Sequence, residues 1–167
     1  MPVIAMTKEM GSLDKEIAEA VAKEMGLATV YEEIIEDLTQ SSGLRRDAVT
    51  RLVEGRGGRF ERWMTDTRAF NAFSRKDLFE IALKGKAVIR GWAAAYLFRP
   101  VRHVPSVRIW APPESRVHNL KKALNREDEA LILSEIKRSD RAYAATLRMS
   151  LRTNSEDPCH YDLVLNT

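Results

Sequence analysis

Short apolar runs alternate with amphipathic stretches along this chain. The run from Val3 to Thr7 has the profile of a buried strand. After Gly11-Ser12, apolar residues recur at helical spacing from Ile17 to Met25, and Gly26 stands where a helix would stop. A strand, a turn and a helix in this order are typical of the opening unit of a parallel sheet.

Later segments repeat this pattern. Further strands are predicted at Lys86 to Arg90, Val104 to Trp110 and Leu163 to Leu165, with a weaker one at Ala28 to Tyr31. Helices are predicted over residues 32–40, 45–54, 74–85, 114–124 and most of 126–151. We therefore expect one three-layer α/β/α domain over residues 1–167, with an open parallel sheet. Ligands of such sheets bind beyond the carboxyl ends of the strands.

The amino-acid composition limits the kind of protein that this chain can be. The chain has 167 residues, of which 44% are hydrophobic and 31% are charged, so a folded domain is expected rather than disorder. A net charge of +3 permits an anionic ligand but does not predict a nucleic-acid-binding surface. Cys159 is the only cysteine, and no apolar run is long enough to cross a membrane. We expect a cytoplasmic protein; a homo-oligomer is left open.

The turn after the first strand is the main candidate for anion binding. A helix N-terminus offers free amides, and a working phosphate loop adds glycines, a lysine and a hydroxyl group. This turn reads Lys8-Glu9-Met10-Gly11-Ser12-Leu13-Asp14-Lys15. Leu13 stands in place of the second glycine, Asp14 in place of the lysine, and Lys15 in place of the hydroxyl residue. An ordinary tight turn with surface charges remains the alternative.

Two other segments carry candidate ligand-binding side chains. Arg90-Gly91 ends a strand, where a ligand could approach the backbone, although Arg90 could equally be a solvated strand end. Basic residues also recur along the last long helical region: Lys137, Arg138, Arg141, Arg148 and Arg152. A mobile lid that closes arginines over phosphates would explain them, and so would a charged, exposed helix.

The remaining clusters predict little chemistry. The aromatic residues Phe60, Trp63, Phe70 and Phe73 fit base stacking, a partner-binding surface or the core of a helical insert. The three histidines and the cysteine lack the spacing of a metal site: His103, His118, His160 and Cys159. No metal site and no nucleophilic triad are predicted.

Taken together, the segments resemble the cytidylate kinase-like family of P-loop nucleoside monophosphate kinases, from Ile4 to Thr167. The resemblance begins with Gly11-Ser12, Glu16-Ile17-Ala18 and Glu33-Ile34-Ile35. It continues with Val88-Ile89-Arg90-Gly91, Val107-Arg108-Ile109-Trp110-Ala111-Pro112, Arg116 and Ser139-Asp140-Arg141. It ends with Asp157-Pro158 and the most specific piece, Tyr161-Asp162-Leu163-Val164-Leu165-Asn166-Thr167.

The resemblance implies ATP and Mg²⁺ as cofactors and a pyrimidine nucleoside monophosphate, such as CMP or dCMP, as acceptor. By this resemblance, Gly11, Ser12 and Lys8 would contact phosphate groups, and Lys15 and Arg141 would be catalytic. It gives acceptor binding to Arg59, Arg62 and Arg90, and places the Ala111-Pro112 turn near the donor base. A helical insert for the acceptor is expected at about residues 41–84, and lid helices at about 126–152.

The chain departs from the family at costly places. Besides the loop, Trp92 replaces an arginine after the strand-end glycine, and Tyr143 replaces a second lid arginine. The chain stops at Asn166-Thr167, so the C-terminal helix of the family is expected to be absent. Each lost donor at a transition-state charge costs about 3 kcal/mol. Two functions stay open: phosphoryl transfer from ATP, or an inactive nucleotide- or phosphate-sensing or structural module.

Overall fold

The computed structural model contains a parallel sheet of five strands. It describes residues 2–7, 9–31, 35–36, 39–40, 45–53, 76, 78–91, 94–151 and 157–167. The strands are β1 (Val3–Met6), β2 (Ala28–Val30), β3 (Ala87–Arg90), β4 (Ser106–Trp110) and β5 (Leu163–Asn166). Their order in the sheet is β2-β3-β1-β4-β5, and every pairing is parallel. The predicted parallel sheet is confirmed.

The central strands β1, β3 and β4 are buried on both faces, which explains why they read as nearly continuous apolar runs. Along β1, Val3 and Ala5 contribute to one core and Met6 to the other, as the twofold repeat of a strand requires. Helix α1 (Asp14–Met25) covers the second face with Ala18 and Ala22. The first face is covered by α3 (Arg46–Val53), by helical residues 78–84 and by the short α6 (Ala94–Leu97).

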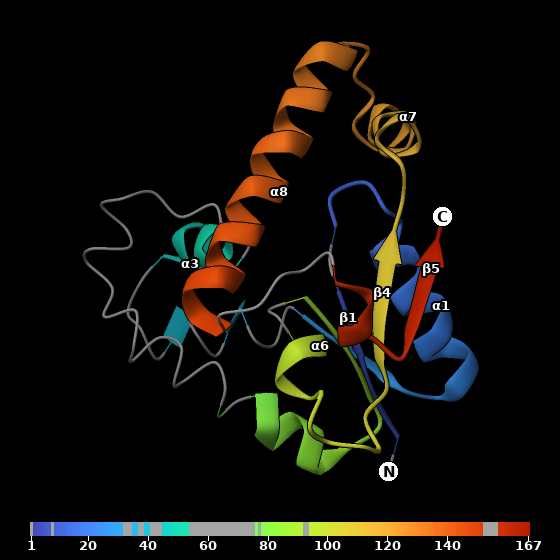
Figure 1. Ribbon diagram of the computed structural model, residues 1–167, viewed down its shortest axis with the longest axis vertical. Helices are drawn as coiled ribbons and strands as arrows, with labels where there is room; N and C mark the ends of the chain where they lie inside the picture. The colour runs from blue at the N-terminus through green and yellow to red at the C-terminus, as the bar shows by residue number, and fades with distance from the viewer. Residues whose placement is uncertain are drawn as a thin grey trace.

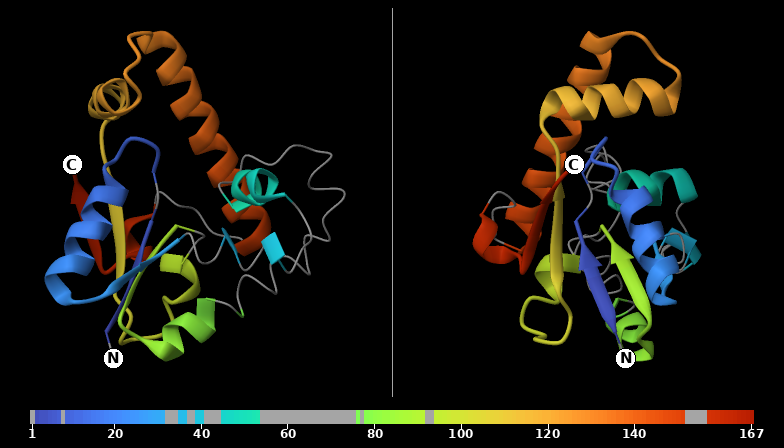
Figure 2. Two further views of the ribbon diagram at one scale, coloured as in Figure 1. Left: turned by 180° about the vertical axis from the view of Figure 1, so that it is seen from behind. Right: turned by 90° about the vertical axis from the view of Figure 1, so that its right-hand side faces the viewer.

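Two helices extend beyond the carboxyl ends of the strands. Strand β4 leads directly into α7 (Pro113–Leu124), and α8 (Glu129–Leu151) returns alongside the sheet (Figures 1 and 2). A single 3-10 turn (Pro158–His160) then leads into β5. The loop between β1 and α1 rises toward α7 and α8 in both figures, so these two helices enclose the region where a ligand of such a sheet would bind.

Where the predicted elements lie in described residues, they agree with the structure except in detail. The short helix α6 at residues 94–97 was not among the predicted elements; it packs against β1 and β4. Helix α8 was expected to lose its apolar stripe after Ile136, yet Leu147 is also buried. Most of the predicted insert at 41–84 lies outside the described residues. Among the described helices, none combines the length and apolar character needed to cross a membrane.

Candidate functional site

The loop between β1 and α1 makes a tight, partly left-handed turn. Gly11 has a φ of 83°, and Leu13, the residue before α1, has a φ of 60°. Ser12 is buried, and both its backbone N–H and its hydroxyl donate to the Glu9 carbonyl. Helix α1 begins at Asp14, so that a carboxylate occupies the positive end of the helix. The loop is thus held by its own polar groups.

Asp14 and Arg90 form an ion pair at the mouth of the loop. The Arg90 Nη1 atom donates to Asp14 Oδ2 over 2.6 Å, and the two side chains are only 12% and 9% exposed. The Arg90 guanidinium also lies 4.5 Å from the centre of the Tyr31 ring. The side chain that was expected to contact an acceptor is therefore held by a carboxylate of the loop itself.

Glu9 and Arg108 form a second pair beside the first. The Arg108 Nε and Nη2 atoms donate to Glu9 Oε1 over 3.3 and 3.1 Å. Burial raises the pKa of the Glu9 carboxyl above its ordinary value, while the nearby guanidinium groups of Arg108 and Arg116 act in the opposite direction. Glu9 is therefore a desolvated carboxylate that depends on these two arginines.

Arg116 joins the loop to both helices above it. Its Nε atom donates to the Met10 carbonyl over 2.7 Å, and its two terminal nitrogens donate to the two carboxylate oxygens of Asp140 over 2.9 and 2.7 Å. Arg116 is buried in α7, whereas the Asp140 side chain on α8 is 46% exposed. This planar, two-bond contact fixes the direction of both groups. The loop, α7 and α8 are connected through one guanidinium group.

Two further side chains bind the carbonyls of the loop. Asn119 Nδ2 donates to the Gly11 carbonyl over 2.9 Å, and Thr167 Oγ1 donates to the Ser12 carbonyl over 2.8 Å. A Cβ atom on Gly11 would lie 2.7 Å from the Arg116 carbonyl oxygen. The glycine is therefore required by contact with α7 as well as by its positive φ.

The residues predicted to be functional are distributed unevenly. Gly11, Ser12 and Arg90 meet at the loop, as described above. Lys15 is 65% exposed and pairs with Glu19 one turn along α1, and Arg141 is exposed on α8. Ala111 is buried, and Pro112 precedes the first turn of α7. Lys8, Arg59, Arg62 and Trp92 lie outside the described residues.

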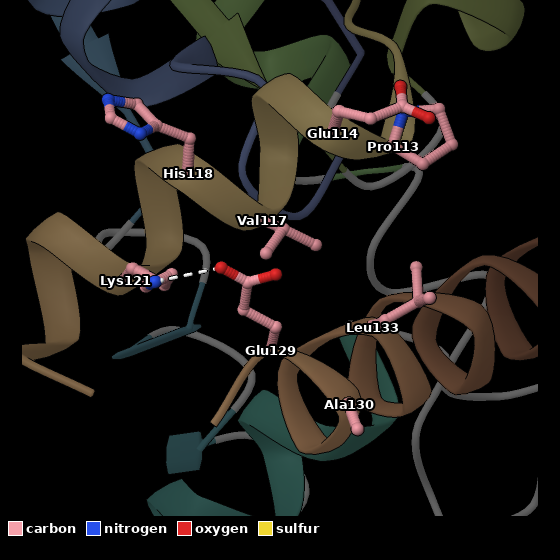
Figure 3. Close-up of a pocket in the computed structure, with 8 residues that line it drawn as sticks. All are labelled: Pro113, Glu114, Val117, His118, Lys121, Glu129, Ala130 and Leu133. Carbon is pink, nitrogen blue, oxygen red and sulfur yellow. Dashed lines mark hydrogen bonds and ion pairs between the residues drawn. The ribbon is translucent and has the colours of Figure 1, made fainter. Parts of the chain in front are cut away.

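A separate groove of about 550 Å³ lies between α7 and α8 (Figure 3). Val117 and Leu133 project into it from the two helices, and Lys121 donates to Glu129 over 2.9 Å. Lys121 also pairs with Glu127 over 3.0 Å. On α7, the groove residues lie on a different side from Arg116 and Asn119, which contact the loop. The groove is thus separate from the loop contacts.

The loop residues do not fit the phosphates of ATP in this arrangement. The Ser12 hydroxyl donates to Glu9 and contacts Asp14 Oδ1 at 3.5 Å, and Asp14 adds a negative charge beside the helix amides. Among the described residues of the loop and the first turn of α1, Lys15 is the lysine that could replace the usual one, and its side chain is exposed and pairs with Glu19. Arg90 could contact a phosphate only if Asp14 released it, and no catalytic step follows from these contacts.

Sequence reasoning missed most of the residues that hold the loop. A partner for Arg108 could have been predicted, because a charged residue between the apolar residues of a buried strand requires one. Glu9 and Asp14 were noted as part of the loop, with Asp14 in place of a lysine, but the arginines that pair with them lie far along the chain. Asn119 and Thr167 act through single hydrogen bonds to backbone carbonyls, which leave no pattern in the sequence.

Comparison with known proteins supports the fold and identifies the family. None of the curated proteins matches the chain. An uncharacterized protein from Eubacterium ventriosum shares the fold with a TM-score of 0.74 at 14% identity, covering 99% of this chain and 88% of that one. Shikimate kinases from Bacteroides thetaiotaomicron and Acinetobacter baumannii follow.

The Bacteroides kinase has a TM-score of 0.58 at 12% identity and covers 99% of this chain and 85% of its own. The Acinetobacter kinase, solved with shikimate, has a TM-score of 0.54 at 13% identity and covers 100% of this chain and 84% of its own. At these identities the likeness concerns the fold alone. The family model of the cytidylate kinase-like family matches residues 3–167. The chain therefore belongs to the cytidylate kinase-like family.

Proposed function

We propose that this chain is a non-catalytic kinase-fold module that responds to a nucleotide or another phosphorylated small molecule. The observation that carries the proposal is the buried pair between Asp14 and Arg90. A carboxylate of the chain occupies the arginine that a phosphate group would use, so a phosphorylated ligand binds only in competition with Asp14. Family membership supports a phosphorylated ligand of the nucleotide type.

The same pair argues against efficient phosphoryl transfer. Phosphoryl transfer depends on positively charged groups that are already in place around the transferred phosphate. Among the described residues, three arginines near the loop are each paired with a carboxylate: Arg90 with Asp14, Arg108 with Glu9 and Arg116 with Asp140. Their charge is largely neutralised before any ligand arrives. We therefore expect no turnover with any nucleoside monophosphate.

A coupled assay of ADP formation tests this proposal. The whole chain is incubated with ATP, Mg²⁺ and each common nucleoside monophosphate, and binding of ATP is followed in parallel by calorimetry. We expect weak ATP binding and no ADP above the rate without protein. ADP formation that disappears in Lys15→Met or Arg141→Met would show that the family activity is kept and that the proposal is wrong. Absence of binding by any phosphorylated ligand would leave a structural role.

A further inference from the structure

Basic side chains gather at the amino ends of the strands, opposite the loop between β1 and α1. Two segments carry them: residues 84–86, which lead from helical residues 78–84 into β3, and residues 98–105, which lead from α6 into β4. Both segments lie at the end of the molecule where the chain begins, and α7 lies at the other end (Figures 1 and 2). Five of their side chains are basic and exposed, and we call them the basic end surface: Lys84, Lys86, Arg99, Arg102 and His103.

The two segments form one surface rather than two separate ones. Strand β1 lies between β3 and β4 in the sheet, so the segments that precede β3 and β4 flank the start of β1. The rings of Phe79 and Phe98 also meet edge to face, with their centres 5.2 Å apart. Phe79 lies in the helical residues that end at Lys84, and Phe98 directly precedes Arg99. The charges on both segments can therefore face one partner together.

Most of these charges have no ionic partner. Within the part of the chain that the structure describes, Lys84, Lys86 and Arg102 take part in no ion pair. The carboxylate residue in the stretches 78–86 and 98–105 is Glu80, which pairs with Lys76 over 3.6 Å. The surface is therefore positive, although the whole chain carries a net charge of only +3.

Apolar side chains protrude beside these charges. Leu83, which directly precedes Lys84, is 85% exposed, and Phe79, one helical turn earlier, is 42% exposed. Moving such side chains from water into an apolar medium is favourable. Exposed leucine and phenylalanine bordered by lysine and arginine are typical of surfaces that lie in a membrane interface.

Charge and shape together select the partner. Cations near an anionic bilayer are attracted to its headgroups, and apolar side chains gain by reaching the acyl boundary below them. Leu83 stands out from its helix, so a partner has to make room for it. A bilayer yields around such a side chain, whereas a folded acidic protein would need a pocket of matching shape.

We propose that the basic end surface binds the surface of an anionic lipid bilayer. Its lysines and arginines lie against the negatively charged headgroups, and Leu83 and Phe79 reach the boundary between headgroups and acyl chains. Contact of this kind is peripheral and requires no membrane-spanning helix. The surface lies at the opposite end of the sheet from the Asp14–Arg90 pair, so it goes beyond the proposed function and is tested independently of it.

The test is co-sedimentation of the whole chain with lipid vesicles. The vesicles contain phosphatidylcholine alone or phosphatidylcholine mixed with phosphatidylserine. We expect saturable binding to the mixed vesicles at low salt and little binding to phosphatidylcholine alone. At about 1 M salt, where charges are screened beyond about 3 Å, binding to the mixed vesicles should be largely lost.

Two variants with matched controls assign the binding to this surface. Lys84→Gln should weaken binding about fivefold, the effect of one cation near an anionic membrane, whereas Lys122→Gln on α7 should not. Leu83→Ser should weaken binding about tenfold, because the membrane no longer buries an apolar side chain there. Leu124, at the end of α7, is 45% exposed, and Leu124→Ser should leave binding unchanged. All four positions are exposed, so each variant should stay folded, which thermal unfolding checks.

Three results would overturn the proposal. If the chain does not sediment with the mixed vesicles, the surface does not bind lipid, and an acidic protein becomes the better partner. If Lys122→Gln weakens binding as much as Lys84→Gln, the vesicles recognise the charge of the whole chain and not this surface. If Leu83→Ser binds as tightly as the unmodified chain, the apolar side chains do not reach the membrane.

Discussion

Single residues decide the chemistry of the loop. Asp14 begins α1 at the place where a phosphate-binding chain would carry a lysine, and it holds Arg90 at a distance of 2.6 Å. Removing one partner of a buried ion pair leaves an uncompensated charge. Asp14→Asn should therefore lower the free energy of unfolding by about 3 kcal/mol.

Urea denaturation measures this cost, and Glu16→Gln is the matched control. Glu16 lies in the same first turn of α1 but is exposed. The control should change stability by less than about 0.5 kcal/mol. Equal losses for the two variants would mean that the Asp14–Arg90 pair does not stabilise the loop.

The buried carboxyl group of Glu9 should make the stability of the fold depend on pH. Burial raises its pKa above the ordinary value of 4.5, so the folded chain holds this proton more tightly than the unfolded chain. Stability from this group is complete below pH 4.5 and is lost as the pH rises through the raised pKa. The free energy of unfolding of Glu9→Gln, measured by urea denaturation between pH 4.5 and 7, should fall less with rising pH than that of the unmodified chain. A parallel pH profile for both proteins would contradict the assignment to Glu9.

At the scale of elements, the loop is fixed by close packing against α7. A Cβ atom on Gly11 would meet the Arg116 carbonyl oxygen at 2.7 Å, in a backbone with a φ of 83°. Gly11→Ala should lower the free energy of unfolding by about 2–4 kcal/mol, because strain and overpacking add. Gly26→Ala is the control: its φ is 64°, but no atom lies within 4 Å of the new Cβ.

Thermal or urea unfolding of both glycine variants separates the cost of backbone strain from the cost of the contact with α7. Gly26→Ala should lose only about 1 kcal/mol, the strain of a left-handed residue. Similar losses at both positions would indicate that backbone strain alone, and not contact with α7, requires Gly11.

The contact between α7 and α8 is a second test at this scale. Arg116 binds Asp140 through two hydrogen bonds, although Asp140 is half exposed, so solvent weakens the pair. A double-mutant cycle with Arg116→Met and Asp140→Asn should give a coupling energy of about 1 kcal/mol. The same cycle on Arg126 and Glu135, whose charged atoms lie 3.9 Å apart, should give a value near zero. Equal coupling in both cycles would mean that Arg116 does not hold α8 specifically.

At the scale of the whole molecule, the sequence predicted the fold better than the site. Short, continuous apolar runs and the helical stripes between them were enough to predict the parallel sheet, because its central strands are buried on both faces. The site depends instead on pairs such as Glu9–Arg108, in which residues 99 positions apart meet only after folding. In the sequence, Asp14 stands where a lysine is expected, and only its contact with Arg90 shows that its charge is compensated within the protein.

The central claim is that Asp14 holds Arg90 and keeps phosphate groups away from the loop between β1 and α1. Its most direct test is a calorimetric titration of inorganic pyrophosphate into the unmodified chain and into Asp14→Asn. If Asp14 competes with phosphate for Arg90, the variant should bind pyrophosphate at least about tenfold more tightly, since it loses one opposing charge and frees one arginine. Glu16→Gln should bind as the unmodified chain does. Equal or weaker binding by Asp14→Asn, in a variant shown to be folded, would contradict the proposal that this carboxylate closes the loop.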